Sequence, residues 1–431
     1  MTKNSLMMMA LGAAACAPAF AWQYDAKVDS AVDKIKDALV VYENKDGGLV
    51  QKVRFAWMEQ YQMAVVQPCG GNGTHLKDGA SPFNHEFRRS WVGVNVNLST
   101  GTEFHTWARI GGLPYRESYN NGHTGKEYSY TDLFDIWVKQ DIKAVKGLSV
   151  KGGKIKPLFT TDYSTPSSQL LCVERSIIGG QQYGLDSNWG VEVNYAPNKE
   201  NNVYAQLMFN DRASASKNMK HTDVYRDGRG LKGEFGYEDK CFGIIGANHK
   251  FAVTEDGYHK LSAQYMHDFD NSYSHGTARG ANYYGANVKD ALSFGHEWKK
   301  GQLTLISNLV ANFEMNSPAA SANGNNIGLQ IQPVWALNPH CDLLLRYTGM
   351  TGHEACKLGG DRYICRQDIS AYAPTWVDSI HALYMGADFY LSGKNKHAAK
   401  LMLGAEYLHA RRAGDTTYCG WEFTSAFRWN F

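Results

Sequence analysis

The chain has 431 residues, with 44 Lys and Arg against 42 Asp and Glu and a formal net charge of +2. This near-neutral balance lacks the basic excess that nucleic-acid binding requires, so we exclude a nucleic-acid partner. The chain also has 25 Tyr, 18 Phe and 11 Trp beside 43 Gly and only 11 Pro. Aromatic residues and glycine in these proportions favour an all-β protein with many strands joined by turns.

Residues 1–21 have the pattern of a secretory signal peptide. Lys3 precedes the apolar run LMMMALGAAACA, and Ala19-Phe20-Ala21 supplies the small residues of a cleavage site. The apolar run is too short and too rich in small residues for a membrane-spanning helix. We therefore predict an exported protein whose mature chain begins after residue 21.

Residues 22–48 are predicted to form a helical lead. Within Lys27–Tyr42, apolar residues recur at steps of three and four with charged residues between them, which indicates an amphipathic helix. Gly47-Gly48 is expected to end it. Two placements remain open, a helix packed inside or at the mouth of its own barrel and a short coiled-coil stalk between subunits.

From Val53 onward the apolar residues recur with a period of two, which predicts strands with one apolar and one polar face. In SWVGVNVNL, residues 90–98, valines face away from asparagines. The same alternation recurs in Val53–Val66, Asn188–Tyr195, Val203–Asn210, Gln302–Phe313, Asp342–Thr348, Ile380–Leu391 and Lys400–Leu408.

Short polar turns and long polar segments alternate between these strands. The long segments are residues 67–85, 112–129, 158–188, 211–232, 270–288, 314–325, 350–378 and 410–418. Counting the strands between them gives about sixteen, an even number, as in bacterial outer-membrane barrels. We therefore predict that residues 49–431 form a transmembrane antiparallel β-barrel of about sixteen strands, with the short turns on the periplasmic side.

The last strand, Gly420–Phe431, shows why closure matters. Its aromatic residues fall on one parity, which only Ser425 interrupts, and its other polar residues fall on the opposite parity. A sheet spans hydrocarbon only when it closes on itself, with one face toward lipid and the other toward water. We therefore expect Phe427, Trp429 and Phe431 to face the lipid and lipopolysaccharide of the bacterial outer membrane. The terminal Phe431 resembles the carboxy-terminal signal that the outer-membrane assembly machinery recognises.

Seven cysteines remain after the signal peptide is removed. Cys356 and Cys365 lie close together in one polar segment, so they are the expected disulfide pair of an exported protein. The sequence has no Cys-x-x-Cys spacing of the kind that binds zinc, and we predict neither a metal nor a cofactor.

A barrel of about sixteen strands leaves an aqueous channel in its lumen. Diffusion porins narrow such a channel with one long loop that folds inward. The third long segment, Leu158–Asn188, is the longest of all. We therefore expect this segment to fold into the lumen and to form the constriction.

Two motifs in this region carry a resemblance to a known family. GGKIKPLF, residues 152–159, and CVERSIIGG, residues 172–180, are similar to the strand and loop motifs of the phosphate-selective porin O and P family. The motif match spans about Lys151 to Gly180, and elsewhere the likeness is one of architecture. The resemblance implies a homotrimeric sixteen-stranded porin that passes small anions, with Lys154, Lys156 and Arg175 as the motif cations.

The charges themselves support a more general function. Lys151, Lys154, Lys156 and Arg175 form a local cluster that would favour anions at a constriction. Acidic residues are predicted to face the same lumen: Asp135, Asp141, Asp162, Glu174, Glu192 and Glu406. We therefore predict a porin for passive diffusion of small hydrophilic solutes, with a preference for anions such as phosphate as the finer hypothesis.

Other functional classes remain open at this point. One is a channel specific for sugars or hydrophobic solutes, and a structural or adhesive barrel is another. An outer-membrane barrel enzyme would need a catalytic set, for which His267, Asp268, Asp270, Ser274 and His275 are the best candidates. No nucleophile-elbow motif accompanies them, so we predict that the protein is not an enzyme.

Overall fold

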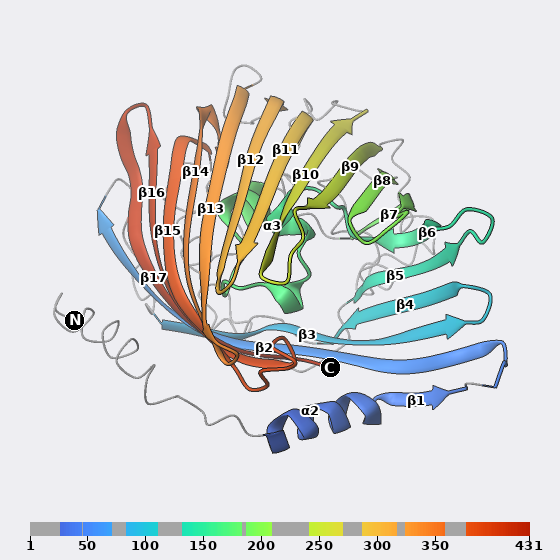
Figure 1. Ribbon diagram of the computed structural model, residues 1–431. Helices are drawn as coiled ribbons and strands as arrows, with labels where there is room; N and C mark the ends of the chain where they lie inside the picture. The colour runs from blue at the N-terminus through green and yellow to red at the C-terminus, as the bar shows by residue number, and fades with distance from the viewer. Residues whose placement is uncertain are drawn as a thin grey trace, which may run out of the picture.

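The computed structural model describes residues 26–44, 46–70, 83–110, 132–182, 187–208, 241–269, 287–316, 324–357 and 376–431. Predicted features that fall elsewhere, including the signal peptide and Cys365, lie outside these ranges. Within them the strands form one ring around a lumen (Figure 1).

Sixteen antiparallel strands, β2 to β17, build the described barrel wall. Each strand pairs with the next one in the chain, and β17 pairs with β2 to close the ring. This confirms the predicted antiparallel sixteen-stranded barrel. The strands are β2 (Val50–Gly70), β3 (Phe83–Leu98), β4 (Thr102–Arg109), β5 (Asp132–Asp141), β6 (Leu148–Ile155), β7 (Asn188–Tyr195), β8 (Asn201–Met208), β9 (Phe242–Phe251), β10 (Gly257–Asp268), β11 (Asn287–Lys300), β12 (Leu303–Asn316), β13 (Gly324–Asn338), β14 (Cys341–Lys357), β15 (Trp376–Tyr390), β16 (Ala399–Arg412) and β17 (Asp415–Asn430).

The two faces of the wall differ in polarity, as β13 illustrates. Leu329 and Ile331 point outward and are each 38% exposed, whereas Gln330 and Gln332 point inward and are 2% and 5% exposed. Successive side chains of a strand alternate between faces, so one apolar and one polar surface result. An apolar exterior around a polar lumen is the arrangement of a barrel that spans a membrane.

The carboxy-terminal strand has the predicted orientation. Phe427 lies outward and is 44% exposed, while Arg428 is fully buried on the inner side. The last residue is part of the sheet, because the backbone N–H of Phe431 donates to the carbonyl oxygen of Trp57 and its carbonyl accepts from the Trp57 N–H, both at 2.9 Å. Recognition of Phe431 by the assembly machinery stays a prediction.

The amino-terminal helix is shorter than predicted. Helix α2 spans Ala26–Ala38, and β1, Val40–Glu43, follows in place of the last helical turn. Val40 and Val41 are β-branched and favour extended backbone. The backbone N–H of Phe55 also donates to the carbonyl oxygen of Leu39, so β1 pairs with the start of β2 just beyond the end of β17.

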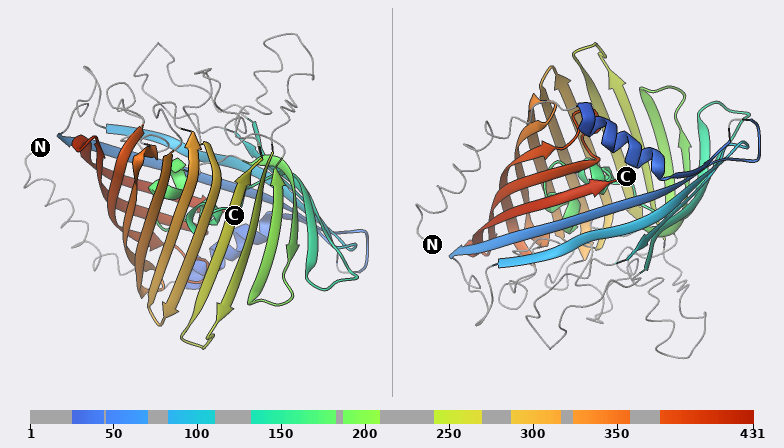
Figure 2. Two further views of the ribbon diagram at one scale, coloured as in Figure 1. Left: turned by 90° about the horizontal axis from the view of Figure 1, so that it is seen from above. Right: turned by 90° about the horizontal axis from the view of Figure 1, so that it is seen from below.

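Helix α2 is fixed to its own barrel. Asp29 accepts a hydrogen bond from Ser392, and Asp33 forms an ion pair with Lys394 at 2.8 Å. Both partners belong to the short turn between β15 and β16, beside which α2 lies (Figure 2). These contacts favour the predicted packing at the barrel mouth over a stalk between subunits.

The helices in the described ranges include none that is both long and apolar enough to cross a membrane.

The prediction of a long loop at the last of the alternating segments is wrong. Residues 410–418 were expected to form a loop, but β16 ends at Arg412 and β17 begins at Asp415. Ala413 and Gly414 make the turn with φ of 51° and 86°. Two central residues with positive φ match the right-handed twist of a two-residue hairpin. The charged flanking residues have the composition of a loop although their backbone is paired.

Leu329 and Gln330 form a matched pair for testing which face meets lipid. Leu329→Arg would place a charge in hydrocarbon, where arginine costs about 2–4 kcal/mol near the bilayer midplane. We expect this variant to show less compact, heat-modifiable barrel on unboiled detergent gels. Gln330→Arg puts the same charge into the lumen and should migrate like the wild type. Equal loss in both variants would contradict the assignment of faces.

Candidate functional site: the inner loop and the lumen

The chain turns into the lumen between β6 and β7. We call residues 156–182 the inner loop; it contains α3 (Thr161–Ser164), the 3-10 turn η1 (Ser167–Gln169) and the π-helical turn η2 (Ile177–Gln182). Figure 1 shows α3 inside the ring of strands. This confirms the prediction that the third long segment folds inward.

Apolar side chains hold part of the inner loop against the wall. Phe159, Ile177 and Ile178 are fully buried and belong to one apolar cluster with Phe242 of β9 and Met350 of β14. Burying side chains of this size stabilises the docked loop by about 1.5–3 kcal/mol each. The inner loop is therefore a packed element of the barrel interior.

Three buried cations of the wall bind the middle of the inner loop. They are Arg346 of β14, Lys400 of β16 and Arg428 of β17. Arg428 donates from Nη1 to the carbonyl oxygen of Leu170 at 3.1 Å, and Lys400 donates to the same oxygen. Arg346 donates from Nη1 to the carbonyl oxygen of Glu174 at 3.0 Å. Hydrogen bonds from charged donors contribute about 1.5–3 kcal/mol each.

The carboxylate of Glu174 adds a second attachment, to β2 and β3. It accepts hydrogen bonds from Arg88 Nε at 2.8 Å and from Gln62 Nε2 at 3.1 Å, and it lies 3.6 Å from Arg89 Nη2. Its side chain is only 7% exposed. The inner loop is thus tied by charge to strands on both sides of the closing seam.

The start of the inner loop meets strands farther round the barrel. The Thr161 hydroxyl lies 3.4 Å from the Ser262 hydroxyl of β10, and the Thr161 backbone N–H donates to Asn308 of β12. Close contact requires glycine at position 295 of β11, because a Cβ there would lie 2.2 Å from Thr161 Oγ1. The inner loop therefore crosses the lumen from one wall toward another.

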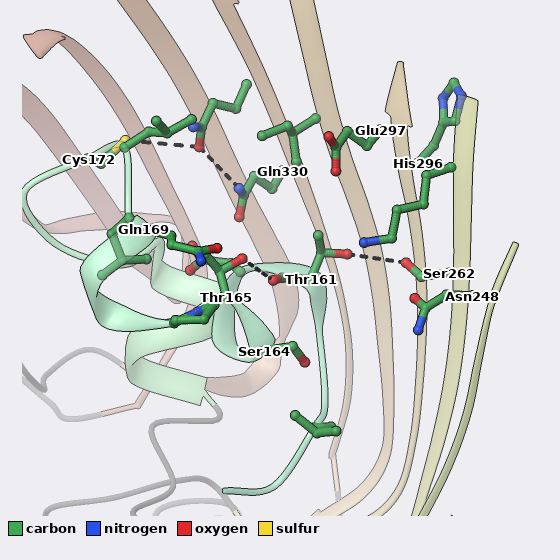
Figure 3. A pocket seen from close by; sticks show the side chains of 18 of the residues that line it. Thr161, Ser164, Thr165, Gln169, Cys172, Asn248, Ser262, His296, Glu297 and Gln330 are labelled. Atoms are coloured by element: carbon green, nitrogen blue, oxygen red, sulfur yellow. Dashed lines mark hydrogen bonds between the residues drawn. The ribbon is translucent and has the colours of Figure 1, made fainter. Parts of the chain in front are cut away.

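A cavity of about 450 Å³ lies between the inner loop and the wall that includes strands β8 to β13. Figure 3 shows hydroxyl and amide side chains of the loop facing those of the strands. Its charged lining residues are two cations and three carboxylates: Lys260, Arg346, Asp162, Glu174 and Glu297. The lining thus has no excess of cations.

The four cations predicted to form the constriction do not line this cavity. Lys151 forms an ion pair with Glu192 at 2.8 Å. Lys154 is 3% exposed and donates to the carbonyl oxygen of Leu133 at 2.7 Å. Both side chains are therefore engaged on the wall near β5 to β7, and neither lines the cavity described above.

Lys156 and Arg175 are brought together by the inner loop. Both donate to the carbonyl oxygen of Thr165, and both lie over the Tyr163 ring, at 4.9 and 5.2 Å from its centroid. Arg175 also donates to the carbonyl oxygen of Asp162. These two cations also lie outside the cavity lining. The effect of the four predicted residues on ion selectivity stays a prediction.

The protonation of Lys156 reflects these surroundings. It belongs to the inner loop rather than to a membrane-spanning strand. Burial, and after it the neighbouring Arg175 guanidinium, hold the pKa of Lys156 well below its usual range. Lys156 therefore carries less positive charge than an exposed lysine would.

Sequence patterns gave no direct sign of the cavity lining. Gln264 of β10 and Gln330 and Gln332 of β13 face inward, but neither strand is among the segments whose period of two predicted a strand. Parity alone places such residues in the lumen. It does not say which of them lie opposite the inner loop, because that depends on contacts between residues far apart in the chain.

The candidate catalytic set is only partly described. His267 Nδ1 lies 2.7 Å from the Asp290 carboxylate, on the same face of β10 as the outward Tyr265. Asp270, Ser274 and His275 fall outside the described ranges. Across those ranges, no group of three or more His, Cys, Asp or Glu side chains is arranged to hold a metal ion.

The predicted disulfide involves one described cysteine. The Cys356 thiol is fully buried and donates to the carbonyl oxygen of Asp378 at 3.6 Å. Its expected partner, Cys365, lies outside the described ranges, so the pairing stays a prediction. In the inner loop, burial raises the pKa of Cys172 to about 12, which keeps that thiol protonated at neutral pH.

No family model matches the sequence, and the search of curated proteins found no match. Solved structures do resemble the fold. The outer-membrane channel DcaP of Acinetobacter baumannii has a TM-score of 0.52 at 10% identity, covering 91% of this chain and 100% of its own. OprB of Pseudomonas putida has a TM-score of 0.53 at 12% identity, covering 88% and 94%. At such identities the likeness shows the fold.

The apolar outer face locates the barrel in a membrane. Its outward side chains include exposed leucine, isoleucine and aromatic residues, whereas the inner face carries buried amides and charges. The architecture is that of outer-membrane barrels, and the similar structure of DcaP is that of an outer-membrane channel. The protein is therefore located in the bacterial outer membrane, as predicted.

Glu174 offers a test of how firmly the inner loop is held. Glu174→Gln removes the negative charge beside Arg88 and Arg89, and breaking a buried ion pair costs about 3–5 kcal/mol. We expect noisier and larger single-channel currents in planar bilayers, because the loop would leave its docked position more often.

Glu103→Gln is the matched control for this variant. Glu103 pairs with Lys139 at 3.9 Å, both side chains are 32% exposed, and neither belongs to the inner loop. Such a pair contributes about 0–1 kcal/mol, so its loss should leave the current unchanged. Wild-type noise and conductance in Glu174→Gln would show that this carboxylate does not hold the loop.

Proposed function

We propose that the protein is an outer-membrane channel for passive diffusion of small hydrophilic solutes. The observation that carries this proposal is the cavity, with both polar and apolar lining residues, left beside an inner loop fixed across the lumen of a closed barrel. A lumen of sixteen strands is wide enough for water, and a docked loop limits the size of what passes. Polar groups along the passage replace part of a solute's hydration without binding it tightly.

Anion preference is the finer part of the proposal and rests on the motif resemblance. The Arg175 guanidinium favours a local positive potential in the inner loop, whereas the neighbouring Lys156 adds less because burial and Arg175 lower its pKa. Against this, the Lys151 charge is met by Glu192, and the cavity lining contains more carboxylates than cations. A phosphate-selective channel needs several cations that face the solute.

A barrel enzyme has less support than a channel. His267 and Asp290 form a close pair, but their face of the strand is the outer one. Acyl transfer would also need a nucleophile within hydrogen-bond reach of the imidazole. In the sheet His267 pairs with Gly243 and Asp290, and the Tyr265 hydroxyl, which lies 3.5 Å from His267 Nδ1, donates to the Asp290 carboxylate.

The proposal predicts ohmic ion channels when purified protein is added to a planar bilayer, with a reversal potential measured across a salt gradient. We expect Lys260→Gln to shift the potential toward cation preference more than Lys154→Gln does, because Lys260 lines the cavity and Lys154 does not. The triple variant K154Q/K156Q/R175Q tests the motif cations together.

The outcomes separate the general function from the finer one. A cation-ward shift in the triple variant larger than that of Lys260→Gln would support the motif cations as the filter. An unchanged potential in the triple variant would remove the phosphate-type proposal and leave the general channel. Bilayers that stay silent with correctly folded, heat-modifiable protein would overturn the channel itself.

A homotrimer is part of the same proposal, since the motif resemblance implies three barrels in one assembly. The expected result is a species of three chain masses on mild native gels and after chemical cross-linking in native membranes. A single chain mass under both conditions would contradict it.

A further inference from the structure

We infer that the cavity beside the inner loop is a binding site for uncharged, polyhydroxylated solutes of the sugar class. The inference rests on the proposed channel function and adds a substrate class to it. It starts from the chemistry of the side chains that the loop and the strands present to each other (Figure 3).

Amides dominate the strand side of the cavity. Gln264 of β10 and Gln330 and Gln332 of β13 all line it, and each is 2–5% exposed. An amide carries an acceptor oxygen and a donor nitrogen side by side. A sugar hydroxyl both donates and accepts, so amides of either orientation can pair with it.

Hydroxyl groups line the loop side of the cavity together with apolar side chains, among them Leu170 and Leu171. Thr161, Ser164 and Thr165 come from α3 and the residue after it, and Gln169 follows in η1. Solute hydroxyls can therefore meet polar groups on two opposite sides at once. A ring with hydroxyls around its edge fits such a two-sided passage.

The charges in the lining are largely met by the protein itself. Arg346 donates to the backbone of Glu174 and lies 3.4 Å from Glu406. The Asp162 carboxylate accepts from the backbone N–H and the hydroxyl of Ser176 at 2.8 and 2.9 Å.

The Glu174 carboxylate is met by Arg88 and Gln62. The last two charged lining residues oppose each other. Lys260 of β10 and Glu297 of β11 are direct partners in the strand register, and their charges are of opposite sign. Their fields offset each other at the distance of a passing solute. The groups left to bind a solute are therefore neutral hydrogen-bonding groups.

Some of these groups lack partners within the protein. The Ser164 hydroxyl and the side-chain oxygens of Gln264 and Gln330 have no hydrogen-bond partner among the residues that the structure describes. Buried polar atoms without partners are unfavourable. Because all three residues line the cavity, we expect a solute hydroxyl there to donate to these oxygens.

Size and polarity restrict the solute further. The cavity volume of about 450 Å³ falls within the range of about 300–1,000 Å³ that holds small organic ligands. An apolar solute would leave the amides unpaired, which is unfavourable. An anion would find its counter-charges already offset, Arg346 by Glu406 and Lys260 by Glu297, so the cost of desolvating the anion would stay uncompensated. A neutral polyol avoids both penalties.

The experiment measures how glucose, added to both sides of a planar bilayer, reduces the salt current through single channels. Gluconate, which has the same carbon chain and a negative charge, is the matched anionic probe. We expect half-maximal reduction at a lower concentration of glucose than of gluconate.

Variants then locate the site. Q264L/Q330L removes two amides at similar side-chain volume and should raise the half-blocking glucose concentration about tenfold. Asn194→Leu removes an amide from the inner face of β7 that does not line the cavity, and should bind glucose like the wild type. Gln330→Asn withdraws the amide from the cavity by one methylene, should also raise the half-blocking glucose concentration, and serves if the double variant does not fold.

The outcomes keep the two proposals apart. Channels that conduct salt while glucose and gluconate reduce the current equally would overturn the sugar site and leave the channel intact. Wild-type glucose block in Q264L/Q330L, or in Gln330→Asn in its place, would also overturn the sugar site and leave the channel intact. Folded protein that conducts no ion would overturn the channel and the sugar site together.

Discussion

The structure depends on one constraint, that backbone polar groups inside hydrocarbon must be paired within the protein. A sheet meets it only by closing, so β17 has to pair with β2. Closure then sorts the side chains, because alternate residues of every strand face lipid or lumen. Residues near both chain ends also pair with β2. Phe431 exchanges backbone hydrogen bonds with Trp57, and the Leu39 carbonyl accepts from the backbone N–H of Phe55.

The parity of the strands could be predicted from the sequence because it is a local property. Phe427 and Arg428 are adjacent, and the pattern around them was enough to assign one to lipid and the other to the lumen. The docking of the inner loop could not be predicted in the same way. Glu174 meets Arg88 and Arg346 across separations of 86 and 172 residues, and no local period encodes such contacts.

The polar composition of residues 410–418 led to a wrong prediction, because charged residues there pair in the sheet. The residues around Ala413-Gly414 are polar, and polar residues are commoner in loops than in strands. At a hairpin end, however, both faces of the ladder can meet water, so the backbone pairs without an apolar pattern. The predicted helix was too long for a related reason. The apolar residues of β1 continue the helical spacing, but their backbone pairs with β2.

The buried charges suggest a division of roles within the lumen. Arg346, Lys400 and Arg428 are desolvated, and such cations persist only when other groups meet their charge. The carbonyl oxygens of the inner loop and nearby carboxylates do so. Cations committed to holding a loop are then not available to attract a solute. Consequently, the number of cations in a barrel interior is a poor guide to selectivity, and the groups that face the open cavity are the relevant ones.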